Sequence, residues 1–190
     1  MPQELIENQT FEKTNYSQSG LPFANYEYCS FTDCNFNGLN LSDYVFSDCT
    51  FKNCNLSMVQ LKNTAFKEVK FINCKLLGMM FFDCNKFLLE MSFEKCNLSY
   101  ASFFKLKIKK TTFRNCMLQE TDFSETDLTS ALFDNCDFSS AQFDHTNLEK
   151  ADLRTSFNYI IDPEQNRLKK AKFSLVGIPG LLVKYDIEVE

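Results

Sequence analysis

The chain has 190 residues, of which 44% are hydrophobic and 24% charged, with a net charge of −5. A chain of this length can bury roughly 70% of its unfolded surface in a single core, and this composition argues against disorder and against membrane insertion. The chain has no Trp, and its single His leaves little material for histidine metal sites or for His-based catalysis.

The first residues, MPQELIENQTFEK, predict no export signal, because they contain neither a basic stretch nor an apolar one. The nine cysteines are compatible with a reducing compartment, where thiols stay free. We therefore expect a cytoplasmic protein.

Large apolar residues recur every five positions from Phe11 to Phe81, and after a slip of two residues the pattern resumes from Phe93 to Leu153. We call each of these positions i. A five-residue period spreads apolar residues around an α-helix instead of forming a stripe. Position i−2 is mostly small or a cysteine, and residues i−2 and i share one side of an extended backbone. Each pentapeptide is therefore predicted to be a short extended stretch followed by a corner.

Four such corners close a coil of 20 residues, and the sequence contains an internal test of this arithmetic. Steps of 20 residues, with one step of 22 across the slip, join residues of one kind into columns. One column holds Phe11, Phe31, Phe51, Phe71, Phe93, Phe113 and Phe133, and another holds Cys34, Cys54, Cys74, Cys96, Cys116 and Cys136. The pattern predicts a four-sided coil of seven turns, roughly 34 Å long at about 4.8 Å per turn, with a two-residue bulge near residues 85–90.

The repeated units match the motif A(D/N)LXX, as in Ala151-Asp152-Leu153, Cys34-Asn35-Phe36 and Thr121-Asp122-Phe123. On this motif the chain resembles pentapeptide-repeat proteins. The resemblance implies an all-β fold, a right-handed quadrilateral parallel β-helix over residues 1–158. A short helical cap and dimerisation segment is expected over residues 159–190.

All nine cysteines fall at position i−2, and none of them form CxxC pairs with the spacing of zinc ligands. They are predicted to be small buried thiols, so we expect no metal, no cofactor and no disulfide. The sequence also contains no phosphate-binding Gly-rich loop, no nucleophile elbow and no Ser/His/Asp set. We expect a protein that is not an enzyme, with His145 as a solvated surface residue.

Between residues 120 and 152 the chain carries nine acidic residues against one basic residue, Lys150. Four of the acids occupy position i−1 on four different faces, so the group is predicted to encircle the rod. This acidic collar consists of Glu120, Asp122, Glu125, Asp127, Asp134, Asp137, Asp144, Glu149 and Asp152. It is either a solvated surface or a binding surface for a protein groove that normally holds nucleic-acid phosphates.

A basic turn precedes the collar and comprises Lys105, Lys107, Lys109, Lys110 and Arg114. Basic clusters are typical of nucleic-acid contacts. This turn lacks a run of exposed aromatic residues for base stacking, so we predict either a solvated face or pairing with neighbouring acids, and no direct binding of nucleic acid.

Phe82 and Phe104 both occupy outward positions and are 22 residues apart, so they are expected to stack on adjacent coils. With Phe87 in the bulge they would form an exposed aromatic patch. Such patches often mark partner sites, although the three rings could equally shield the bulge.

The C-terminal segment contains the signals of a cap, which an open β-helix needs at its end. Asp162-Pro163-Glu164 predicts a helix start, while the alternation at Ile187 and Val189 predicts a short strand. Leu168, Ala171 and Phe173 could add a degenerate last coil. We expect a two-fold dimer interface formed by Ile178, Leu181, Leu182, Tyr185, Ile187 and Val189.

This tail also resembles those of the quinolone-resistance (Qnr) and microcin immunity pentapeptide proteins. The likeness rests on Ile161-Asp162-Pro163, Asn166-Arg167, Gly180-Leu181-Leu182 and Ile187-Glu188-Val189. It implies a dimeric rod that mimics duplex DNA and binds a type II topoisomerase, DNA gyrase or topoisomerase IV, to protect it from poisons. The chain lacks the long projecting loops of many Qnr proteins. An interaction scaffold for an unrelated partner, recognised through the exposed aromatic patch, stays open as the alternative.

Overall fold

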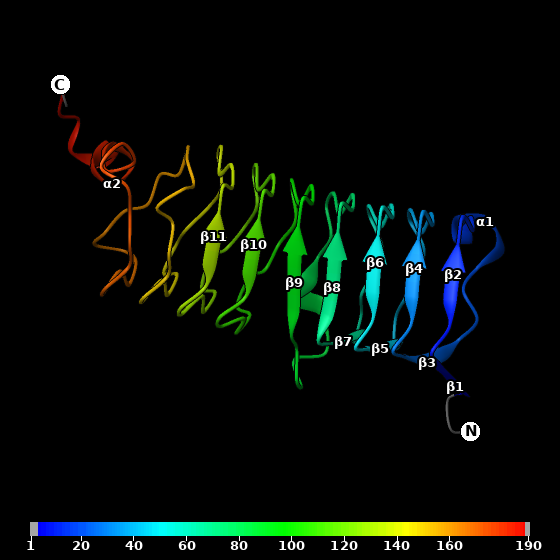
Figure 1. The fold of residues 1–190 in the computed structure, drawn as a ribbon. Helices are drawn as coiled ribbons and strands as arrows, with labels where there is room; N and C mark the ends of the chain where they lie inside the picture. The colour runs from blue at the N-terminus through cyan, green and yellow to red at the C-terminus, as the bar shows by residue number, and fades with distance from the viewer. Residues whose placement is uncertain (1–3, 189–190) are drawn as a thin grey trace.

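The computed structural model describes residues 4–188 and shows a right-handed, four-sided parallel β-helix of about seven turns (Figure 1). Successive coils lie side by side along the rod, from the N-terminal end to a small helix at the C-terminal end. Among the described residues, the strands are β1 (Glu4–Glu7), β2 (Thr10–Glu12), β3 (Ala24–Glu27), β4 (Ser30–Thr32), β5 (Val45–Ser47), β6 (Thr50–Lys52), β7 (Ala65–Lys67), β8 (Val69–Ile72), β9 (Met91–Glu94), β10 (Thr112–Arg114) and β11 (Leu132–Asp134).

The strands form two parallel sheets on neighbouring sides of the coil. A seven-stranded sheet has the order β11-β10-β9-β8-β6-β4-β2, and a four-stranded sheet has the order β1-β3-β5-β7. The helical elements are short: α1 (Tyr16–Ser19), η1 (Phe81–Asp83), α2 (Pro179–Leu182) and η2 (Val183–Tyr185). None of the helices within residues 4–188 is both long and apolar enough to cross a membrane.

The register confirms the two-residue slip. Strand β6 pairs with β8 through Phe51 and Phe71, 20 residues apart, whereas β8 pairs with β9 through Phe71 and Phe93, 22 residues apart. The next pair, Phe93 with Phe113, returns to 20. The four-stranded sheet ends at β7, where the bulge follows, while the seven-stranded sheet continues. The extra residues are thus absorbed on one side of the coil.

Stacked aromatic rings fill the interior. The rings of Phe31 and Phe51 lie 4.8 Å apart and nearly parallel, at 9°, and Phe31 meets Phe36 of the next side edge-on at 5.6 Å. Both geometries are favourable for aromatic pairs and add about 0.5–1.5 kcal/mol each beyond the burial of apolar area. The period of the sequence therefore places the same ring type in the same environment in every coil.

The residue at i−2 is mostly small because it must fit against the preceding coil, and many of the Cys and Thr residues there also donate a hydrogen bond to that coil. The Cys54 thiol donates to the carbonyl of Phe31 at 3.3 Å, and the Thr64 hydroxyl donates to the carbonyl of Leu41 at 2.7 Å. All nine cysteines are free and buried. Burial raises the pKa of the Cys49 thiol to about 12, so this thiol stays protonated. No group of three or more His, Cys, Asp or Glu in residues 4–188 could hold a metal ion.

Asn and Asp recur because the corners use them in two ways. At i−1, the side-chain oxygen of Asn35 accepts a hydrogen bond from the backbone N–H of Asn37 at 3.1 Å, an Asx turn. At i+2 the backbone is left-handed, with φ of 55° at Asn53, a region that Asn and Asp tolerate best after Gly. Asn53 also donates from its amide to Asp33 of the preceding coil at 2.9 Å.

The coil continues beyond residue 158, through parallel bridges that join Asn147 to Arg167 and Asp152 to Lys172. The helix start predicted at Asp162-Pro163-Glu164 is wrong, because these residues form a turn. Asp162 accepts a hydrogen bond from the Glu164 N–H at 2.8 Å, so the same local signal serves an ordinary corner. The helix of the cap is α2.

The strand predicted at the end of the chain is not seen at Ile187, which is irregular and exposed. Val189, the other residue of that prediction, lies outside the described residues. The tail instead ends in the 3₁₀ turn η2.

Candidate partner-binding surfaces

The acidic collar lies on all four sides of the rod. Four separate parallel bridges, one on each side, hold its i−1 members: Ser102 with Asp122, Lys107 with Asp127, Met117 with Asp137 and Leu132 with Asp152. The collar acids therefore encircle the rod, as the repeat predicts.

Part of the collar is neutralised by nearby bases, three of them on the preceding coil and Arg154 on the same coil. Four of its carboxylates form ion pairs with Lys or Arg at distances between 2.7 and 3.6 Å: Glu125 with Lys105, Asp127 with Lys109, Asp134 with Arg114 and Asp152 with Arg154. Exposed pairs of this kind contribute little to stability. They do reduce the negative electrostatic potential that a partner would meet at the collar. Three residues of the basic turn, Lys105, Lys109 and Arg114, take part in these pairs.

The remaining collar carboxylates have no Lys or Arg within ion-pair distance among the described residues. They are Glu120, Asp122, Asp137, Asp144 and Glu149. Asp144 contacts His145 at 2.7 Å. None of the five belongs to the side of the seven-stranded sheet, where both collar acids, Asp134 and Asp152, are paired. The free negative charge of the collar thus lies on the other three sides.

Asp137 shows how a collar acid is held. It accepts hydrogen bonds from the N–H of Ser139 at 3.0 Å, from the Ser139 hydroxyl at 2.7 Å and from the Asn158 amide at 2.8 Å. Partial burial acts to raise the pKa of this carboxyl, but the donors from Ser139 and Asn158 outweigh it, and the pKa is lowered. The carboxylate is therefore charged and fixed in orientation at neutral pH.

The three rings of the exposed aromatic patch differ in their surroundings. Phe87 in the bulge is 71% exposed and Phe82 is 36% exposed, whereas Phe104 is half-buried. The Lys105 ammonium lies 4.6 Å from the centre of the Phe104 ring, and the ring contacts of the described residues do not include a Phe82–Phe104 stack. The bulge, with Leu88 beside Phe87, is the most exposed part of this patch.

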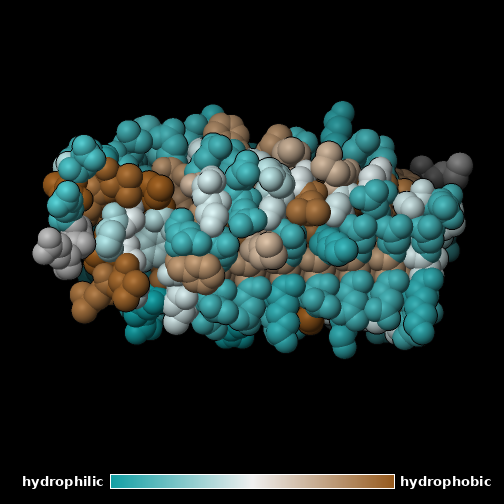
Figure 2. Space-filling view, turned by 90° about the horizontal axis from the view of Figure 1, so that it is seen from above, coloured by the Kyte–Doolittle hydropathy of each residue, from teal (hydrophilic) through white to brown (hydrophobic). Residues whose placement is uncertain are grey.

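Apolar side chains also gather at the C-terminal end, at the left of Figure 2. Of the predicted interface residues, Leu181 packs partly against the core, Ile178 and Leu182 are half-buried, and Tyr185 and Ile187 are exposed. The sequence analysis missed Leu175 and Val176, each 91% exposed. Their signal was an apolar pair that matches no position of the repeat.

Ion pairs hold the tail onto the last coil. The Lys184 ammonium lies 2.8 Å from Asp162 and 2.6 Å from Glu164, and the Tyr185 hydroxyl donates to Glu164 at 2.9 Å. Lys184 lowers the pKa of both carboxyls. The turn that sequence analysis took for a helix start therefore serves as the docking point of η2.

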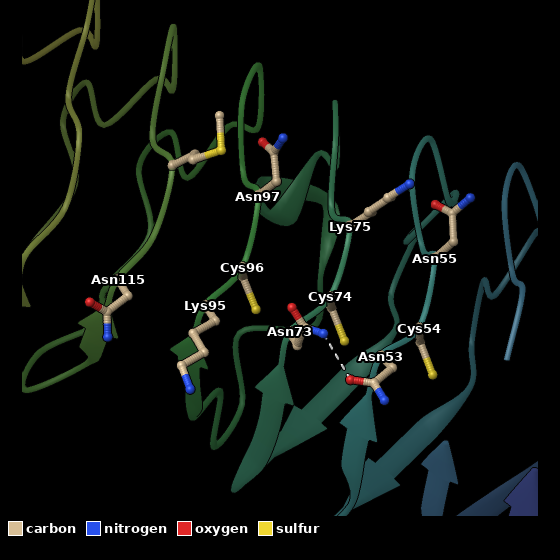
Figure 3. A pocket seen from close by; sticks show the side chains of 11 residues that line it. Asn53, Cys54, Asn55, Asn73, Cys74, Lys75, Lys95, Cys96, Asn97 and Asn115 are labelled. Carbon is tan, nitrogen blue, oxygen red and sulfur yellow. Dashed lines mark hydrogen bonds between the residues drawn. The ribbon is translucent and has the colours of Figure 1, made fainter. Parts of the chain in front are cut away.

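A groove along one corner of the rod was not predicted. It borders the seven-stranded sheet, has a volume of about 500 Å³ and is drawn in Figure 3. Cys54, Cys74 and Cys96 form its floor, between one wall that includes Asn53 and Asn73 and another that includes the residues two positions later in each coil. Each thiol is only 1–2% exposed. The walls offer amide and ammonium donors.

The family description "Pentapeptide repeat region" matches residues 24–88 and 86–157. The chain therefore belongs to the pentapeptide-repeat family. No curated protein sequence matches it significantly.

Two solved structures resemble this chain over nearly its whole length. A trypsin-treated variant of QnrB1, described as a plasmid-mediated fluoroquinolone resistance protein, is 25% identical with a TM-score of 0.62, covering 98% of this chain and 92% of that one. A second trypsin-treated variant of QnrB1 is 22% identical with a TM-score of 0.52, covering 98% and 99%. The second likeness shows the fold alone.

Proposed function

We propose that this protein is a non-enzymatic, cytoplasmic DNA mimic that binds a type II topoisomerase, DNA gyrase or topoisomerase IV, and modulates it or protects it from quinolones or toxins. The observation that carries the proposal is the likeness to QnrB1 over nearly the whole length of both chains. The five collar carboxylates without a Lys or Arg partner support it, because they present negative charge to a groove that would otherwise hold phosphates.

The collar can be tested without disturbing the coil. Asn already occupies position i−1 in other coils and makes the same Asx turn, as Asn35 does. Replacing Asp122 and Asp137 by Asn therefore removes two charges and keeps the turn acceptor. We expect the Asp122→Asn/Asp137→Asn protein to keep its thermal midpoint. It should bind gyrase at least about tenfold more weakly than the wild type, since a close charge pair at an interface contributes about 1.5 kcal/mol or more.

The matched control removes two collar charges that are already neutralised. Asp134→Asn/Asp152→Asn changes the side of the seven-stranded sheet, where Arg114 and Arg154 pair with these acids. It should leave gyrase binding within about twofold. The functional assay is gyrase supercoiling and quinolone-induced cleavage with protein added to tens of micromolar. No effect of the wild type on either activity, together with no binding, would contradict the proposal.

We also propose that the protein forms a homodimer through its C-terminal tail. Support comes from Leu175 and Val176, whose nearly complete exposure is unusual for adjacent large apolar residues on a monomer. Partners with two-fold symmetry would bury the same patch on both chains.

The alternative function, a scaffold for an unrelated partner, is favoured by the exposure of Phe87 in the bulge. It predicts that Phe87→Ser abolishes capture of a partner from host lysate, whereas the two collar variants do not. Retention of gyrase by the wild type, lost on Asp122→Asn/Asp137→Asn and unchanged by Phe87→Ser, would decide against this alternative.

A further inference from the structure

Basic residues dominate the middle of the rod. Residues 49–119 contain twelve Lys and Arg against four Asp and Glu, whereas the flanking residues 1–48 contain one against seven. The acidic collar follows on the other flank. The rod is therefore banded along its axis, with a basic middle between two acidic parts.

Within this band, the side of the seven-stranded sheet carries basic residues that the collar does not neutralise. Lys52 lies on β6, Lys70 lies on β8, and Lys75 lies on the far wall of the corner groove. All three are exposed, and none has an acidic group within ion-pair distance among residues 4–188. Lys95, which pairs with Glu94, and Arg114, which pairs with the collar acid Asp134, extend the same surface. We call these five residues the basic face.

Hydrogen-bond donors surround the lysines of the basic face. Neighbouring outward positions on the sheet carry the hydroxyls of Thr50, Ser92 and Thr112. Asn53 and Asn73 line the groove at its edge, where Asn73 donates to Asn53 at 2.9 Å and so fixes the orientation of both amides (Figure 3). Ammonium, hydroxyl and amide groups are the set that proteins use to contact nucleic-acid phosphates.

The composition of the face selects among anionic partners. No outward residue of β6, β8, β9 or β10 is aromatic, and Ile72 is the single apolar residue among these outward residues. Single strands bind mainly by stacking their bases on aromatic rings, and protein partners rely on buried apolar anchors. A duplex sugar–phosphate backbone requires only charge and hydrogen bonds.

The extent of the face sets the direction of a bound duplex. The lysines and Arg114 span strands β6, β8, β9 and β10, which is three strand spacings or roughly 14 Å. Acidic residues follow on both flanks of the same side, at Asp33 and at Asp134. Glu94, an outward residue of β9, is an acid within the face and pairs with Lys95 at 3.8 Å. A duplex along the rod would place phosphates over Asp33 and Asp134, whereas a duplex across the rod at β6 and β8 meets Lys52, Lys70 and Lys75.

We propose that the basic face binds the sugar–phosphate backbone of duplex DNA lying across the rod. The basic turn of residues 105–114 predicted no nucleic-acid contact, and its bases do pair largely with the collar. The basic face shares Arg114 with that turn, but its lysines come from separate pentapeptides that the coil brings together. This inference goes beyond the proposed function, since it concerns a surface on which every collar acid is paired and an interaction that needs no topoisomerase.

The test is fluorescence anisotropy of a labelled 20-base-pair duplex with the full chain alone, at 50 and 200 mM salt. The variant is Lys52→Thr/Lys70→Thr/Lys75→Asn, in which each new residue copies its register partner in the preceding coil: Thr32, Thr50 and Asn55. We expect wild-type affinity on the order of 10⁻⁵ M at low salt. The variant should bind at least about tenfold more weakly, with a salt slope smaller by about 2 to 3.

The matched control removes three lysines from the neighbouring side of the rod: Lys67→Ser, Lys107→Asn and Lys110→Ser, which copy Ser47, Asn147 and Ser130. It should keep wild-type affinity within about twofold. Failure of the wild type to bind at 50 mM salt overturns the inference, and so does equal loss in both triple variants.

Competition by poly-glutamate as effective as competition by unlabelled duplex of the same charge would also overturn the inference, since it would indicate an acidic-protein site. If the triple variant unfolds, Lys70→Thr alone, expected to weaken binding about threefold, replaces it. Gyrase is absent from the assay, so its outcome is independent of the collar variants.

Discussion

The coils and the C-terminal tail bury their apolar side chains to very different extents. In the coils, Phe31, Phe51 and Phe113 are completely buried, because each ring is covered by the rings of the coils before and after it. In the tail, Leu175 and Val176 are almost fully exposed. A repeating unit is covered by its neighbours, whereas the unit that ends the stack has no next coil. The tail is therefore where a second copy would add buried area.

The largest effect should come from opening a gap in the ring column. Phe93 is 1% exposed and stacks on Phe71 at 5.4 Å and on Phe113 at 5.0 Å. We expect Phe93→Ala to lower the free energy of unfolding by about 3–5 kcal/mol, measured by urea denaturation. Leu175→Ala in the tail is the control and should change it by less than about 0.5 kcal/mol. Similar losses for the two variants would remove the distinction between coil and tail.

The second prediction reverses the comparison by measuring association instead of stability. Leu175→Ser/Val176→Ser should leave the urea midpoint unchanged but weaken the dimer by at least about tenfold, since each buried aliphatic side chain contributes about 1.5–3 kcal/mol. Sedimentation equilibrium at several concentrations measures this. A monomeric wild type at 100 µM, or a dimer that the variant leaves intact, would place the interface elsewhere.

A smaller effect separates charge from hydrogen bonding at the corners. Asp137→Ala removes the acceptor of four hydrogen bonds and should cost about 1 kcal/mol. Asp137→Asn keeps the Asx turn and should cost less than about 0.5 kcal/mol. Because the folded pKa of Asp137 is lowered, its contribution is present above the usual carboxyl pKa and is lost as the pH falls through the lowered value. Urea titrations over a range of pH should show the difference between Asp137→Ala and the wild type at its largest at pH 7 and shrinking as the pH falls through the lowered pKa.

The smallest effect concerns the docking of the tail. The pKa values of Asp162 and Glu164 are lowered by Lys184, so the contact is complete above the usual carboxyl pKa of about 4 and is lost as the pH falls through the lowered values. Hydrogen exchange of residues 179–185 should speed up at pH 3 relative to the intrinsic rate, and Lys184→Met should produce the same loss of protection at pH 7. Exchange in β9 should not change in either case.

The repeat could be predicted because its signal is local and cumulative. The inward and outward positions can be read from each pentapeptide alone. Columns of one residue type, such as Phe71, Phe93 and Phe113, appear only when the two-residue slip is included in the register. The coil, the bulge, the buried thiols and the encircling collar follow from this one-dimensional pattern. The signal fails at Asp162-Pro163-Glu164, because Asp followed by Pro starts a helix and closes a corner with the same hydrogen bond.

The sequence by itself determined that the chain is a four-sided solenoid and which residues point inward, because that information is carried by the spacing of residues along the chain. Only the tertiary structure decided which carboxylates are neutralised, that Lys52, Lys70 and Lys75 share one surface, and where the tail docks. These properties depend on contacts between residues about 20 positions apart. A count of charges along the sequence sums over all four sides of the rod, whereas a partner meets only one of them.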